Sequence, residues 1–387
     1  MTDRQTDRQT DRQTDRQTDR QIDRQTDRAN HIDLIESIAI FFVIVYHTTV
    51  YFFDFTQNGF VINYILYYFR TILSTCVPLF FFVNGYLLLN KEFILKKHVI
   101  KTIRLIVLTL VWAIILMPTY MIIEHKPLSL GVIFKSILNL DMTWGMNLFW
   151  FMGALICIYI LFPALKALFD ANKKAFIFFV AACFVLTLGV VFVSQVITIF
   201  GEAFHISNKQ TLRSFLYHPM LTMINPFRGS YGYSFVYFCI GGLIYSFEDK
   251  ILKIYALRRN IISALGIIVS CYGLFLIGLF NTSIDREVWD VVWNGYDTIF
   301  TLINVICIYI LSLNYRKNLS VIRLISCNTL GIYFMHGLFI RLTRPWVESK
   351  EFLCNLPINL VYALLILFVC LMICFVIRKI PILRKMI

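Results

Sequence analysis

Stretches of mainly apolar residues follow one another from residue 32 onward, separated by shorter polar segments. A helix needs about 20 mainly apolar residues to cross the hydrocarbon core of a bilayer. The pattern therefore predicts about ten transmembrane helices, at residues 34–53, 71–89, 99–123, 148–166, 175–200, 233–247, 261–280, 295–313, 326–342 and 357–377. The stretch 326–342 is the least apolar of them, because it carries Asn328, His336 and Arg341.

The loops between these stretches differ in charge. If the N-terminus lies inside the cell, the loops on that side carry most of the Lys and Arg residues of the membrane part. Cytoplasmic loops are normally the ones enriched in these residues. We therefore expect an all-α polytopic membrane protein with about ten transmembrane helices and both termini cytoplasmic.

Composition supports this fold class. The chain is 58% hydrophobic and only 15% charged, whereas soluble domains carry about 25% charged residues. The net charge of +13 favours contacts with anionic lipid heads, and no nucleic-acid motif accompanies it. Most of the cysteines lie in apolar runs without a CxxC pair, so no disulfide framework is expected. The sequence has no HxxxH pair or carboxylate cluster, so no metal site is expected either.

The N-terminal segment has a different character. Residues 1–30 are dominated by a Thr-Asp-Arg-Gln repeat whose acidic and basic side chains cancel. We expect a disordered or fraying helical tail there and a single membrane domain over residues 31–387. The segment lacks the apolar core of a signal peptide.

The four-residue period also suggests something about the gene. The codons ACA-GAC-AGA-CAG encode Thr-Asp-Arg-Gln and are a repeated ACAG tetranucleotide. Strand slippage in such a tract shifts the reading frame, which predicts an on/off expression switch. The alternatives are a repeat selected for a property of the peptide and a misassigned start codon.

Polar groups inside apolar stretches are the first functional candidates, because they are costly in hydrocarbon. His47 lies in the first predicted helix and suits a general base near neutral pH; the alternative is a histidine that only packs between helices. Glu36 lies eleven residues earlier, on the same helix face and about 16 Å away. This distance is too long for a direct acid–base pair, so Glu36 lies at the inner water boundary or complements the helix N-terminus.

Two further segments combine polar groups with helix positions. Asn84 and Tyr86 flank Gly85 and face either a substrate cavity or a neighbouring helix. Lys101 and Arg104 lie one turn apart. They fit the phosphates of a nucleotide-bearing donor or a positively charged cytoplasmic flank.

The remaining candidates lie near predicted membrane boundaries or in the ninth stretch. Trp150 and Arg228 accompany several tyrosines, as in an aromatic belt or a sugar-binding surface. Tyr333 and His336 place a second histidine inside the membrane.

Taken in order, the segments IDLIESIAIFFVIVYH, VPLFFFVNGYLL, KTIRLIVLTLVW, LFWFMGALICIYILFP, FVYFCIGGLIY and TLGIYFMH resemble the membrane acyltransferase-3 family. The resemblance spans about residues 30–377, and it implies that His47 is catalytic. Asn84-Gly85-Tyr86 stands where the family has Ser-Gly-Tyr, and Glu36 stands where it has an arginine. Lys101 and Arg104 match basic positions, and Tyr333 and His336 match a late Ile-Tyr-x-x-His segment.

The family acts mainly on surface carbohydrates. The resemblance therefore implies an O-acetyltransferase of the bacterial inner membrane that uses acetyl-CoA as donor substrate and binds no cofactor. Its acceptor would be a glycan or glycolipid, with lipopolysaccharide favoured because a switched gene suits an exposed antigen. The alternatives are a polysaccharide exporter and a non-catalytic membrane scaffold.

Overall fold

The structure is a computed structural model that describes residues 30–51, 53–58, 60–126, 129–131, 134, 149–203, 231–285 and 287–380. Every regular element in these residues is a helix. The repeat tail, Arg228 and residues 381–387 lie outside the described residues. The expected tail conformation and the cytoplasmic position of both termini therefore stay predictions.

The described part begins with a helix at Asn30–Thr48. It is followed by α2 (Phe55–Asn58), α3 (Val61–Arg70), the 3-10 turn η1 (Thr71–Thr75), α4 (Cys76–Leu89), α5 (Leu95–Ile123), α7 (Phe149–Ala171), α8 (Lys173–Phe184), the π-turn η3 (Val185–Gly189) and α9 (Val190–Ala203). The second half comprises α12 (Tyr233–Tyr245), α13 (Glu248–Leu252), α14 (Ala256–Asp285), η4 (Trp293–Gly295), α15 (Ile299–Ser312), α16 (Ser320–Ser326), α17 (Thr329–Glu348), η5 (Glu351–Leu353) and α18 (Leu356–Lys379).

Each of the ten predicted stretches overlaps a helix, but the number of membrane crossings is not confirmed. In the described part of the chain, 7 helices are long and apolar enough to cross a membrane. The helices α12 and α15 have only 13 and 14 residues, or about 20 Å at 1.5 Å per residue, against a core of about 30 Å. The helix α17 is long enough but carries Arg341, Arg344 and Glu348.

The first helix ends at Thr48, five residues before the predicted boundary at residue 53. The hydroxyl groups of Thr48 and Thr49 donate to the carbonyl oxygens of Val45 and Tyr46, at 3.2 and 2.6 Å. Such side-chain bonds compete with the helical ladder. Beyond this point the backbone N–H of Val50 donates to the side chain of Asn359 instead.

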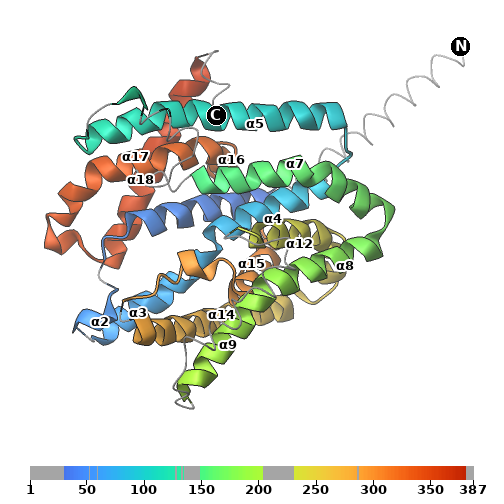
Figure 1. The fold of residues 1–387 in the computed structure, drawn as a ribbon, viewed down its shortest axis with the longest axis horizontal. Coiled ribbons are helices and arrows are strands. Elements are labelled where there is room, and N and C mark those ends of the chain that lie inside the picture. Colours follow the sequence, from blue (N-terminus) through green and yellow to red (C-terminus); the bar gives the residue numbers. More distant parts are fainter. Residues whose placement is uncertain are drawn as a thin grey trace, which may run out of the picture.

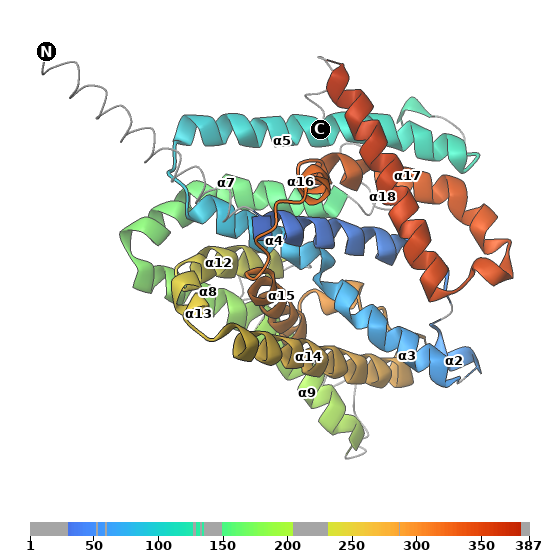
Figure 2. The same ribbon diagram turned by 180° about the vertical axis from the view of Figure 1, so that it is seen from behind.

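The helices form a bundle in which Asn30–Thr48, α4 and α7 lie between α5 on one edge and α14 with α9 on the other (Figure 1). Seen from behind, α18 lies obliquely across α17 (Figure 2). Large apolar side chains are exposed along α5, α14 and α18, whereas α4 is buried along most of its length. Exposed apolar bands of this extent fit a lipid-facing surface, so the chain is a multi-pass membrane protein.

Two glycines bring α4 and α12 into close contact in the centre of the bundle. A Cβ added to Gly85 would overlap the backbone of Phe238, and one added to Gly241 would overlap the backbone of Phe82. Small residues of this kind allow backbones to approach in membrane bundles. The pair fixes α4 in the bundle, and the ring of His31 in the Asn30–Thr48 helix lies 5.8 Å from that of Tyr86 in α4.

Candidate active site

His47 lies one residue before the end of the first helix and lines two neighbouring cavities. The first, here the aromatic cavity, has a volume of about 240 Å³; it is lined by Val43, Tyr46, His47, Cys76, Val77, Trp150, Asp290, Trp293, Tyr296 and Tyr333. The second, here the polar cavity, measures about 590 Å³; it is lined by Tyr46, His47, Thr49, Val50, Tyr51, Phe53, Asp54, Arg70, Arg344, Glu348 and Cys354. Tyr46 and His47 belong to both linings, so they form a wall that the two cavities share.

His336 of α17 lies beside His47. The centroids of the two imidazole rings are 5.3 Å apart, and the His336 side chain is fully buried. Its Nδ1 lies 3.3 Å from the carbonyl oxygen of Ile332, while its Nε2 has no hydrogen-bond partner among the described residues. The fold thus pairs two histidines that lie almost 300 positions apart in the sequence.

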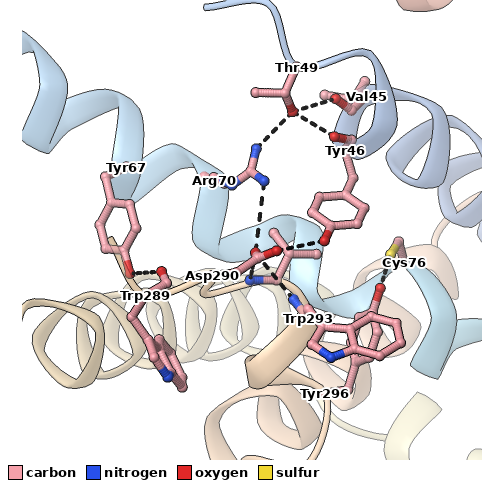
Figure 3. A network of polar contacts seen from close by, with 11 residues as sticks. Val45, Tyr46, Thr49, Tyr67, Arg70, Cys76, Trp289, Asp290, Trp293 and Tyr296 are labelled. Carbon is pink, nitrogen blue, oxygen red and sulfur yellow. Dashed lines mark hydrogen bonds and ion pairs between the residues drawn. The ribbon is translucent and has the colours of Figure 1, made fainter. Parts of the chain in front are cut away.

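The side chain of Tyr46 belongs to a polar network that includes Asp290, Arg70 and Thr49 (Figure 3). Its hydroxyl donates to Oδ2 of Asp290 at 2.6 Å. Oδ1 of the same carboxylate accepts the backbone N–H of Val292 at 3.0 Å. These bonds tie the loop between α14 and α15 to the end of the first helix, and they orient the ring that forms half of the shared wall.

Arg70, at the junction of α3 and η1, completes this network. Its Nη1 donates to the hydroxyl of Thr49 at 2.8 Å, and its Nη2 lies 3.8 Å from Oδ1 of Asp290. The guanidinium carbon lies 4.3 Å from the ring centroid of Phe53 and 5.0 Å from that of Tyr46. Arg70 is only 6% exposed, so its charge lies inside the protein, next to the polar cavity.

Three of the candidate residues from the sequence lie next to His47. Trp150 and Tyr333 line the aromatic cavity, and the ring of His336 contacts that of His47. The ring of Trp150 also stacks on that of Tyr231, with centroids 4.9 Å apart. Aromatic rings therefore make up much of the wall of the small cavity next to His47. Arg228 lies outside the described residues.

The structure places the other candidates away from both cavities. Asn84 accepts a hydrogen bond from the Tyr159 hydroxyl at 3.1 Å, and Tyr86 donates to the buried carboxylate of Glu248 at 2.6 Å. Glu36 accepts a hydrogen bond from the hydroxyl of Ser326 at 2.5 Å. Each of these contacts ties two helices together.

The two basic candidates lie on the surface of α5. Lys101 and Arg104 are both exposed. The Lys101 ammonium lies 5.2 Å from the ring centroid of Tyr159, whose hydroxyl group donates to Asn84. Neither basic side chain lines the cavities at His47.

Sequence reasoning missed Arg70, Asp290, Arg344 and Glu348, all of which line the cavities. In the sequence, Arg70 and Arg344 count as basic residues at the ends of apolar stretches. Asp290 lies in a connection with no motif of its own. The one available signal was the tyrosine next to His47, since a buried phenol normally finds a hydrogen-bond partner.

Comparison with known proteins adds a family. Residues 30–379 match a family model described as an acyltransferase domain. No match was found among curated proteins or solved structures.

Proposed function

The chain belongs to the acyltransferase-3 family of membrane O-acyltransferases, and from this membership we propose that it acetylates a sugar hydroxyl of a bacterial surface glycan. The donor is acetyl-CoA, the acceptor is lipopolysaccharide, and the protein resides in the inner membrane. The observation that carries the proposal is the position of His47 in a wall shared by two unlike cavities.

The two cavities suit the two halves of an acyl transfer. The aromatic cavity, at about 240 Å³, is smaller than the 300–1,000 Å³ of typical small-molecule sites, and it suits a short acyl group. The polar cavity, at about 590 Å³, offers aromatic rings and hydrogen-bonding groups to a sugar. A base between the two sites is within reach of a sugar hydroxyl on one side and an acyl carbon on the other.

His47 is the base in this mechanism. It takes the proton of the sugar hydroxyl, the sugar oxygen forms a bond to the acyl carbon, and the carbon–sulfur bond of the thioester breaks. The proton then passes to the departing thiolate. In the second possible route, the His47 ring first takes the acyl group and passes it to the sugar. Both routes need a neutral imidazole in the resting enzyme.

His336 is the partner of His47 in this proposal. Its buried ring lies against the catalytic ring, and its Nε2 retains hydrogen-bonding capacity. A second imidazole in this position orients the first and accepts its proton for a moment during transfer.

The donor enters from the cytoplasmic side. Lys101 and Arg104 are exposed on α5, and their charges suit the phosphates of coenzyme A. They replace the arginine that the family carries where this chain has Glu36. Because Glu36 bonds to Ser326, its role here is to join the first helix to α16.

The repeat in residues 1–30 adds a regulatory proposal. Slippage in the ACAG tract switches expression on and off, so that acetylation of the surface antigen varies among cells. Sequencing the tract in single colonies, together with their acetylation state, tests this proposal.

The catalytic proposal is tested with the full-length protein in lipid nanodiscs. Labelled acetyl-CoA is supplied together with glycan isolated from cells that lack the gene. We expect label in the glycan with the wild type and none with His47→Ala, while His125→Asn, at an exposed turn after α5, retains activity. Undiminished transfer by His47→Ala would remove His47 as the base. No transfer by the wild type, combined with movement of glycan across the membrane, would favour export.

A further inference from the structure

Arg70 has hydrogen-bonding capacity that the protein does not use. A guanidinium group carries five N–H donors. In the described part of the chain Nη1 binds Thr49 and Nη2 faces Asp290 at the long distance of 3.8 Å. Its Nε is buried and has no hydrogen-bond partner there. A buried charge with one loose counter-ion is costly, which indicates that a further partner binds next to it.

The carboxylates of the polar cavity have partners of their own. Glu348 pairs with Arg344 at 2.7 Å. Oδ1 of Asp54 accepts hydrogen bonds from the backbone N–H and the hydroxyl of Thr56, at 2.8 and 2.5 Å. Among the described residues, Arg70 is therefore the arginine of this lining that has no carboxylate oxygen at hydrogen-bonding distance.

Asp290 is a weak counter-ion for Arg70, because both of its carboxylate oxygens accept hydrogen bonds from other groups. Its Oδ2 accepts the Tyr46 hydroxyl at 2.6 Å, and its Oδ1 accepts a backbone N–H at 3.0 Å. Both oxygens are therefore engaged at shorter range than the 3.8 Å contact to Arg70. The negative charge of Asp290 is directed toward Tyr46 and the loop more than toward the guanidinium.

The polar cavity joins this arginine to the proposed base. Arg70, Arg344 and His47 all line it, and its volume of about 590 Å³ lies within the range of small-molecule sites. A sugar bound there can present a hydroxyl to His47 and a second group to the arginines. A neutral hydroxyl group would accept a hydrogen bond from Arg70 but would not compensate its positive charge. An anion would accept the hydrogen bond and compensate the charge.

We propose that the polar cavity binds an acidic group of the acceptor, a carboxylate or a phosphate, through Arg70 and Arg344. This inference rests on the proposed function, since it assigns the acceptor to that cavity. It narrows the substrate class to acidic or phosphorylated sugars, acetylated on a hydroxyl near the charged group.

Matched sugars test the inference on the full-length protein in nanodiscs. The probes are methyl galactoside, methyl galacturonoside and galactose 6-phosphate, with the corresponding glucose and mannose series. Binding is measured by microscale thermophoresis without a donor. In at least one series, we expect an acidic sugar to bind at least about tenfold more tightly than its neutral parent. Comparing the uronate with the sugar phosphate then shows whether the site prefers a carboxylate or a phosphate.

Variants then locate the preference. Arg70→Gln should abolish it, and Arg344→Gln should reduce it; the second side chain is 43% exposed, so its removal leaves the fold intact. Arg258→Gln, at an exposed arginine of α14, is the matched control and should keep the preference. Equal binding of acidic and neutral members in every series, or a preference that survives both substitutions at the cavity, would overturn the inference.

The proposed function fails by a different result. His47→Ala should still prefer the acidic sugar although it transfers nothing. A wild type that binds acidic sugars through Arg70 but acetylates no glycan would contradict the transferase and leave the anion site standing. A wild type that acetylates only neutral acceptors would leave the transferase standing and overturn the anion site.

Discussion

The hydrogen bond from Tyr46 to Asp290 holds the wall that both cavities share, and its strength can be measured. Tyr46→Phe deletes the hydroxyl and leaves the ring in place. The oxygen–oxygen distance of 2.6 Å is typical of a bond to a charged acceptor, which contributes about 1.5–3 kcal/mol. The Asp290 side chain is 37% exposed, so water replaces part of the lost bond. We therefore expect a coupling free energy of about 1–1.5 kcal/mol.

A double-mutant cycle isolates this quantity. The free energy of unfolding is measured in mixed micelles for the wild type, Tyr46→Phe, Asp290→Ala and the double variant. The parallel cycle with Tyr68→Phe is the control, because that hydroxyl makes a 3.3 Å exposed bond to Ile268 and should be additive with Asp290→Ala. A Tyr46–Asp290 coupling below about 0.3 kcal/mol, within ordinary additivity, would refute the reasoning that this bond orients the wall.

Three further changes have expected outcomes of different kinds. Gly241→Ala places a Cβ against the backbone of Phe82 and should lower the free energy of unfolding by about 1–3 kcal/mol; unchanged stability in mixed micelles would contradict the close packing of α4 and α12. Burial raises the pKa of Asp297, in the loop before α15, to about 6. Its protonated form is thus favoured by folding, and the stability it contributes below pH about 4 is lost as the pH rises through about 6. In Asp297→Asn the melting temperature should therefore change less between pH 4 and 7 than it does in the wild type. An unaltered dependence of the melting temperature on pH would exclude this carboxyl group as the source of that dependence. Lys101→Ala should raise the KM for acetyl-CoA more than it lowers kcat, and an unchanged KM in this variant and in Arg104→Ala would exclude α5 as the donor site.

The positions of the helices could be predicted because the membrane imposes a simple requirement on the sequence. Long apolar runs such as Leu356–Lys379 have no alternative to a spanning helix, and every predicted run overlaps a helix in the structure. The ends were harder, since the first helix stops where threonine hydroxyls bond back to the backbone. The number of crossings was harder still. Helices as short as α12 and α15 are shielded by neighbours, and their burial is not visible in a hydropathy pattern.

The site was predictable in part for the same reason. A histidine inside an apolar run is conspicuous, and His47 and His336 were both found in this way. That their rings lie 5.3 Å apart depends on how α17 packs against the first helix, which local pattern does not encode. Arg70 was missed because a basic residue directly before an apolar stretch resembles a membrane flank, and only the fold shows that its side chain is buried.

The measurement that tests the account most directly is mass spectrometry of the surface glycan. It compares cells that carry the gene in frame, cells that lack it, and cells complemented with the wild type or with His47→Ala. We predict that deletion removes the mass of an acetyl group from the glycan, that the wild type restores it and that His47→Ala does not, although this variant is found in the membrane at the same level. A glycan of identical mass in all four strains, or full restoration by His47→Ala, would contradict the assignment of His47 as the base of a glycan O-acetyltransferase.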